Sequence, residues 1–197
     1  MPDPATRDRL LDAAWQEATE RGVDRLTLAA VGARAGVTRQ AVYLHFGNRA
    51  TLLIEMADRV DHTSGFRSGL ATTRHLMPRE GFRRMLEIWF DYIPSILRVH
   101  LALEAASLSG GDGADAYRDR MRDWREGIRI SIERLADAGE LSPMWDVGRA
   151  TDWTWASVHP TTFHHLTSER RWTRAETAQR IIDTLERELL SGEADHP

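Results

Sequence analysis

The sequence contains no cysteine and no lysine, and it has no apolar run long enough to cross a membrane. Without cysteine, disulfide bonds and thiol nucleophiles are excluded. The first residues, MPDPATRDRLL, lack the basic-then-apolar pattern of a secretory signal, so the expected compartment is the cytoplasm, without membrane association. Hydrophobic residues make up 42% and charged residues 28% of the chain, proportions that are typical of a folded globular protein.

Acidic residues are missing from one stretch of an otherwise acidic chain. The formal net charge is −4, yet no acid occurs between Asp24 and Glu55. Four arginines give this window a charge of +4 and leave −8 for the rest of the chain: Arg25, Arg34, Arg39 and Arg49. A local positive surface on an acidic body is typical of a protein that meets a polyanion with one face only.

Apolar residues recur at helical spacing throughout the chain, and no strand-like alternation stands out, which predicts an all-α fold. Glycine, proline and N-cap residues separate the helices. Pro94 is expected in a first turn or at a kink, and residues 109–115 form the clearest loop. The predicted helices cover 6–21, 28–35, 39–45, a stretch after Asn48, 79–93, 94–109, a long helix through 117–135 that Gly139 closes, 146–168 and 173–191.

The segment LTLAAVGARAGVTRQAVYLHFGNRATLL, residues 26–53, has the features of two short helices joined by a tight turn. Thr27 and Thr38 can cap the two helices, and Gly36 can take the left-handed conformation that the turn needs. Gly32 is small enough for a close crossing. The apolar positions form a small core: Leu28, Val31, Val37 and Val42. Such a helix-turn-helix motif can place its second helix in the major groove of DNA.

The outward face of the second helix carries hydrogen-bond donors and no acid. These candidate contacts are Thr38, Arg39, Gln40, Tyr43 and His45. A helical hairpin that serves only as core is the alternative interpretation. The turn chemistry and the acid-free face favour DNA binding, because an acid on that face would repel phosphate.

The segment 26–53, together with the preceding RLLDAAWQEATERGVDRLT, resembles the DNA-binding signature of the TetR family of transcriptional regulators. The resemblance extends over about residues 6–56. The resemblance implies a homodimer that binds a palindromic operator in double-stranded DNA, usually as a repressor, and releases it when a small molecule enters the C-terminal domain. It also implies phosphate contacts by Thr27, Tyr43 and Arg49. It places the following residues in or beside the major groove: Thr38, Arg39, Gln40 and His45.

The remainder of the chain is expected to hold the effector and the partner subunit. Residues 1–50 form the predicted helix-turn-helix domain, and residues 51–197 form the predicted effector-binding and dimerisation domain. Apolar residues make a stripe on the last helix that should be hard to bury in one subunit: Ala178, Ile181, Ile182, Leu185 and Leu189. This stripe predicts a two-fold dimer through the helices at 146–168 and 173–191.

Large aromatic residues on separate helices of this part predict an internal cavity for an apolar or aromatic effector. The candidate lining residues are Trp89, Trp124, Trp153, Trp155, His159 and Phe163. Plain core packing is the alternative interpretation of these aromatics. No cofactor is expected.

Two other function classes fit parts of the sequence. A helical metal-dependent enzyme would use His159 and His164, and an architectural DNA-binding protein would have no effector. His164 and His165 are adjacent, and His159 is five residues from His164, so these imidazoles share no helix face and no metal site is expected. An architectural protein would not need the large acidic helical domain. The sequence therefore favours a ligand-responsive regulator without enzymatic activity.

Overall fold

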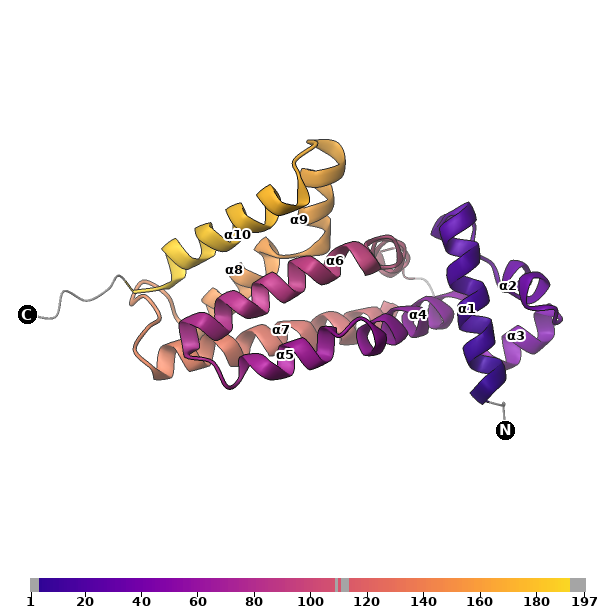
Figure 1. Ribbon diagram of the computed structural model, residues 1–197, viewed down its shortest axis with the longest axis horizontal. Coiled ribbons are helices and arrows are strands. Elements are labelled where there is room, and N and C mark those ends of the chain that lie inside the picture. The colour runs from indigo at the N-terminus through magenta and orange to yellow at the C-terminus, as the bar shows by residue number, and fades with distance from the viewer. Residues whose placement is uncertain (1–3, 109, 111–113, 192–197) are drawn as a thin grey trace, which may run out of the picture. The chain divides into compact units, whose positions relative to one another are not determined.

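The computed structural model describes residues 4–108, 110 and 114–191 (Figure 1). The regular structure in these residues is helical, which confirms the predicted all-α fold. A single antiparallel bridge joins Leu141 to Leu190. Most of the loop predicted at 109–115 lies outside the described residues. None of the described helices combines the length and the apolar character that crossing a bilayer requires.

The N-terminal helices have nearly the predicted bounds. They are α1 (Pro4–Arg21), the short 3-10 helix η1 (Val23–Arg25), α2 (Leu28–Ala35), α3 (Arg39–Phe46) and α4 (Arg49–Thr63). The following helices are α5 (Phe66–Thr73), α6 (Pro78–Leu108), α7 (Ala114–Asp137), α8 (Val147–Ser157), α9 (Pro160–His164), the π-helical turn η2 (His165–Glu169) and α10 (Arg174–Leu189).

The chain divides into two compact units. The first contains the described residues of Met1–Thr63 and Ile96–Asp119, and the second contains those of Ser64–Ser95 and Arg120–Pro197. The unit that holds α1, α2 and α3 thus also includes α4 and extends past the domain boundary predicted at residue 50.

In the first unit, α1 packs against α2 and α4, and α3 packs against α2 (Figure 1). The apolar positions of these helices form one buried core: Leu10, Leu11, Ala14, Val31, Val42, Phe46, Leu52 and Leu53. Each helix is too short to be stable alone, so burial of this shared core stabilises the arrangement.

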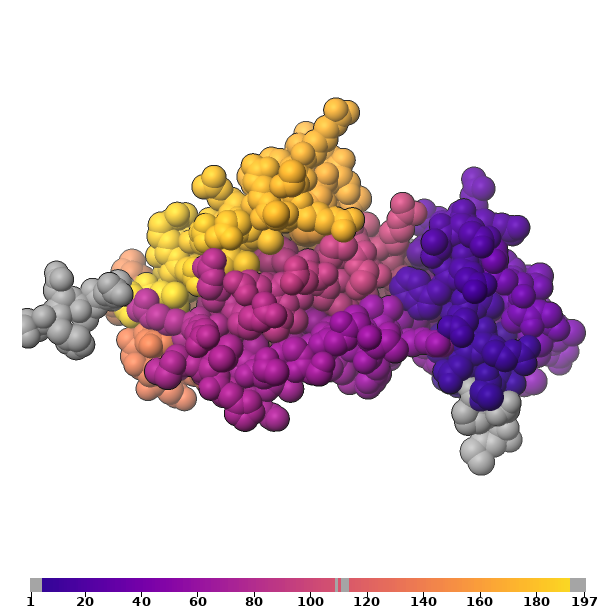
Figure 2. Space-filling model, viewed as in Figure 1, coloured from indigo at the N-terminus to yellow at the C-terminus, as the bar shows by residue number. Residues whose placement is uncertain are grey.

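In the second unit, α6 and α7 contribute most of the largest fully buried side chains: Phe82, Leu86, Ile93, Ile128, Ile132 and Leu135. The helix α10 covers the first half of α6, as Figure 2 shows in yellow against magenta. Arg83 of α6 forms ion pairs with Asp183, at 3.8 Å, and with Glu186, both of α10. Hydrophobic burial and these ion pairs hold the two helices together.

Two helix predictions were wrong in the C-terminal part, and one helix was missed. The segments 79–93 and 94–109 form the single helix α6, which continues through Pro94. A proline removes one helical hydrogen bond, but Ile93 and Ile96 are buried on either side, and their packing holds the helix together. The segment 146–168 is interrupted after Ser157, because Pro160 starts a new helix. The helix α5 was not predicted.

Candidate nucleic-acid interface and aromatic cluster

The turn between α2 and α3 has the backbone geometry that its sequence predicts. Gly36 ends α2 with a φ of 71°, and the side chain of Thr27 caps α2 by accepting a hydrogen bond from the Ala30 backbone N–H at 3.1 Å. A Cβ atom on Gly32 would lie 2.9 Å from the Val37 carbonyl oxygen, so the backbone of the turn approaches α2 as closely as glycine permits. This close approach helps to set where α3 begins.

One side of α3 is buried and the other is open to solvent. Val42 and Phe46 lie in the core, with 0% and 3% of their surface exposed. The predicted contacts Thr38, Arg39, Gln40 and Tyr43 are all exposed. The side chain of Leu44 is also exposed, at 71% of its surface, and was not among the predicted contacts. Its offset of two residues from the buried Val42 and Phe46 places it on the side of α3 opposite the core, which could have revealed it.

The hydroxyls of Thr27 and Thr38 both serve as helix caps. Thr38 accepts a hydrogen bond from the Ala41 backbone N–H at 3.2 Å, in the same way that Thr27 caps α2. Capping uses only the acceptor function of a hydroxyl. Each hydroxyl therefore keeps a proton that can be donated to a phosphate oxygen from an exposed position.

His45 lies at the edge of the face that carries the other predicted contacts. Its side chain is half-buried, and its Nδ1 atom is buried without a hydrogen-bond partner among the described residues. The ring lies beside that of Phe46, with centroids 6.1 Å apart. A contact from His45 to DNA stays a prediction, and only the outer edge of the ring is placed to make it.

Arg34 does not add free positive charge to this surface. Its guanidinium binds the buried carboxylate of Glu17, at 2.8 Å, and the carboxylate of Glu20, both of α1. The hydrogen bonds from Glu20 and Glu17 raise the pKa of Arg34 above its usual value. The charge of +4 counted along the acid-free window is therefore partly neutralised by acids from α1, which the linear sequence places outside the window.

Arg49 forms hydrogen bonds within the protein. Its Nε donates to the Leu26 carbonyl at 2.8 Å, and its Nη2 donates to the Val23 carbonyl at 2.9 Å. These bonds tie the start of α4 to the chain between α1 and α2. The phosphate contact implied for Arg49 stays a prediction, and the structure adds a positioning role that was not expected.

Replacing Arg49 tests that positioning role. Arg49→Lys keeps a cation at the start of α4 but cannot form the forked pair of hydrogen bonds, so we expect the free energy of unfolding to fall by about 1–3 kcal/mol. Urea denaturation measures this change. Arg25→Lys, at an exposed position of η1, is the matched control and should leave the stability unchanged. Equal stability of both variants would contradict the role.

Four aromatic rings from α5, α6 and α7 form a cluster in the second unit: Phe66, Trp89, Tyr92 and Trp124. Trp89 and Trp124 are stacked with centroids 3.9 Å apart, and Phe66 and Tyr92 are stacked at 4.0 Å. The indole N–H of Trp89 donates to the Val158 carbonyl at 2.7 Å. The indole N–H of Trp124 is buried and has no partner among the described residues. A buried donor without an acceptor is costly, so a hydrogen bond from this N–H to a new acceptor would be favourable.

Only some of the six predicted pocket residues lie together. Trp89 and Trp124 are in contact, which leaves no room between their rings, contrary to the expected void. Trp155 lies against His159, with centroids 4.9 Å apart. Trp153 is 44% exposed and faces Trp145 instead. Phe163 is buried against another phenylalanine, Phe90.

Phe66 and Tyr92 belong to the cluster but were not predicted. Tyr92 follows Trp89 by three residues on α6, and this spacing places both rings on one helix face. The same spacing in the sequence could have indicated that Tyr92 belongs to the cluster. Phe66 is the first residue of α5. Leu70, four residues later, lies on the same helix face and could have indicated α5.

The two histidines that a metal-dependent enzyme was expected to use, His159 and His164, lie at opposite ends of α9. Nδ1 of His159 accepts a hydrogen bond from the Thr161 backbone N–H, at 3.3 Å, and so caps α9.

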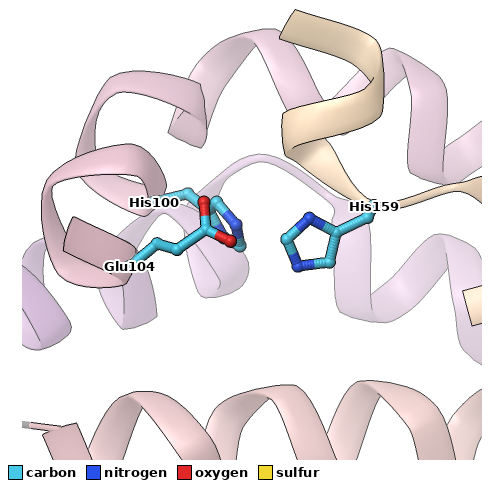
Figure 3. A group of neighbouring side chains, drawn as sticks. All are labelled: His100, Glu104 and His159. Carbon is cyan, nitrogen blue, oxygen red and sulfur yellow. The ribbon is translucent and has the colours of Figure 1, made fainter. Parts of the chain in front are cut away.

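Figure 3 labels His159 together with His100 and Glu104, which lie one turn apart on α6. His100 is buried, and its Nε2 lies 3.2 Å from the hydroxyl of Tyr117 on α7. Burial raises the pKa of that hydroxyl, and the charge of Glu104 raises it further. The His100–Tyr117 contact joins α6 to α7 within the first unit.

Comparisons with known proteins agree with this geometry. A family model described as bacterial regulatory proteins, tetR family, matches residues 10–56. The HTH-type transcriptional regulator TtgR of Pseudomonas putida is 43% identical over 152 residues, which cover 74% of this chain and 72% of TtgR. The probable regulator ArpR of Pseudomonas putida is 27% identical over the same length.

Solved structures share the fold at lower sequence identity. A transcriptional regulator from Saccharomonospora viridis, in complex with choline, has a TM-score of 0.79 and 19% identity over 96% of this chain and 100% of its own. The SmeT–triclosan complex has a TM-score of 0.70 and 22% identity over 98% of this chain and 95% of its own.

Proposed function

Because the chain belongs to the tetR family of bacterial transcriptional regulators, we propose that it is a repressor that leaves its operator when a small molecule binds. The exposed face of α3, which follows the close approach at Gly32, carries this proposal. Residues 1–50 would bind DNA, and residues 51–197 would bind the effector and the partner subunit, with α4 as the mechanical link.

The helix α3 would enter the major groove of the operator. Gln40 lies on the exposed face in the first turn, where its amide can form a bidentate pair with adenine. Tyr43, which is 57% exposed, lies at the flank of that face, closer to the sugar–phosphate backbone. Arg39 can reach either a guanine or a phosphate.

The homodimer would form through α8 and α10, but through only part of the stripe that suggested it. Ile182, Leu185 and Leu189 are buried within their own chain, so that expectation about the stripe was wrong. The half-buried residues Ala178 and Ile181 remain on α10, and the exposed Trp153 lies on α8. These residues supply the apolar surface for an isologous contact.

The aromatic cluster would receive the effector. A flat aromatic ligand can pack against the rings, and a hydrogen-bond acceptor on it can satisfy the buried N–H of Trp124. A sugar phosphate offers acceptors for this N–H but no flat aromatic surface to pack against the rings. An apolar or aromatic compound with at least one acceptor is therefore the proposed effector class.

Release would follow from geometry. In a two-fold dimer, the recognition helices must lie about 34–36 Å apart to enter successive major grooves on one face of DNA. A ligand that binds better to a conformation with another spacing shifts the equilibrium away from the operator by its differential affinity.

Ligand titration of the operator complex tests this function. The operator is obtained by selecting a random-sequence duplex pool with the full chain, and fluorescence anisotropy then follows binding. We expect an aromatic probe such as triclosan to weaken operator binding by about 5–150-fold, the usual range of allosteric coupling, and a sugar phosphate to have no effect.

Matched variants separate the parts of the proposal. Trp124→Phe replaces the indole by a smaller aromatic ring without an N–H, so it should reduce the release by triclosan while operator affinity stays unchanged. Choline, which offers a cation in place of an aromatic ring, should not release the operator. If no aromatic compound changes operator binding, the effector proposal fails. If the pool yields no preferred sequence, the protein is an architectural binder or does not bind DNA.

A further inference from the structure

Leu44 is the most exposed large hydrophobic residue of the proposed recognition helix α3, at 71%. It lies two residues after Val42 and two residues before Phe46, the buried residues of that helix. At about 3.6 residues per turn, two residues rotate the side chain by a little more than half a turn. Leu44 is thus centred on the side of α3 that points away from the core.

Gln40 shares this central position. It precedes Val42 by two residues and Leu44 by four, so Gln40 and Leu44 lie one above the other on the exposed face. The helix α3 contains no acid. An amide and a branched apolar side chain therefore form the middle of a surface that suits a polyanion.

The edges of base pairs in the major groove are polar, with one exception. Thymine presents a C5 methyl group there, and apolar side chains recognise it by direct contact. A leucine in the middle of a groove-facing surface has no donor or acceptor to offer a base. Thymine compensates its burial best, because its methyl group offers the largest apolar surface of the four bases in this groove.

We propose that Leu44 reads a thymine methyl group in each half-site of the operator. The inference rests on the proposed function, in which α3 enters the major groove. Leu44 then makes sequence-specific contacts in addition to the predicted hydrogen-bonding residues, and it selects an A·T pair in one orientation.

The register of α3 predicts where this thymine lies. Gln40 and Leu44 are four residues apart, which corresponds to about 6 Å along a helix that rises 1.5 Å per residue. Base pairs are stacked about 3.4 Å apart. The thymine read by Leu44 should therefore lie within about two base pairs of the base read by Gln40.

Replacing thymine by uracil tests the proposal, because it deletes only the C5 methyl group. The probe is the duplex selected from the random pool, with each thymine replaced in turn and binding of the full chain measured by fluorescence anisotropy. At one thymine per half-site we expect affinity to fall by about fourfold, the value of one buried methyl group. In Leu44→Ala the penalty for uracil at that position should disappear.

Two control variants make the result specific. Leu108→Ala removes a leucine that is 85% exposed at the end of α6, and it should keep the full uracil penalty. Gln40→Ala should bind the operator more weakly but also keep that penalty.

The inference is overturned if no uracil reduces the affinity of the unaltered chain, or if Leu44→Ala retains every penalty. A pool without any enriched sequence would instead remove the proposed function itself.

Discussion

Trp89→Ala should lower the free energy of unfolding by about 3–5 kcal/mol, the usual cost of truncating a buried tryptophan. The side chain is 3% exposed, and its ring is stacked on Trp124. Truncation removes this contact and also the hydrogen bond to the buried Val158 carbonyl. Urea denaturation followed by circular dichroism measures the change.

Two further variants show which interaction matters. Trp153→Ala truncates a tryptophan that is 44% exposed and should cost far less, although it removes the same number of atoms. Trp89→Phe keeps an aromatic ring but not the N–H donor, so it should cost about 1–3 kcal/mol, the value of leaving a buried carbonyl unsatisfied. Equal losses for Trp89→Ala and Trp153→Ala would show that the cluster is not part of the stabilising core.

Inserting about five base pairs between the two half-sites should weaken operator binding by about 100-fold or more. The insertion rotates one half-site by about half a turn, because the DNA helix repeats every 10–10.5 base pairs. A rigid dimer then engages one half-site only. It loses the gain of about 10²–10⁴-fold that bivalent binding provides.

The same insertion placed outside the half-sites is the control and should not change the affinity. Destroying one half-site by base substitution should produce the same loss as the central insertion, because both leave a single site. Anisotropy titrations of the three duplexes make the comparison. Unchanged binding to the duplex with the central insertion would indicate that each subunit binds its half-site independently.

The local features of the N-terminal part were predictable because neighbouring residues determine them. The Thr27 and Thr38 caps depend on a hydroxyl and a backbone N–H three residues later. The turn at Gly36 depends on one residue that takes a positive φ without steric cost. The helix that follows Asn48 begins as expected, with the Asn48 side chain accepting from the Thr51 N–H at 2.8 Å.

Partners that are far apart in the sequence were not predictable. Arg34 and Arg49 both lie in the acid-free window, with no acid near them in the sequence. Arg34 nevertheless binds acids of α1, whereas Arg49 binds two backbone carbonyls. Nothing adjacent to either arginine distinguishes them. Their partners become available only when the helices pack.

The C-terminal part shows the same division. The sequence alone determined that this part is helical and that Gly139 ends α7, with a φ of 70°. Only the tertiary structure decided that α6 continues through Pro94 and that Trp89 stacks on Trp124 while Trp153 faces solvent. It also decided that Ile182, Leu185 and Leu189 of the α10 stripe are buried in their own subunit. Helix formation depends on residues within one or two turns, whereas pairing between helices depends on side-chain packing across elements that the periodicity of a single helix does not specify.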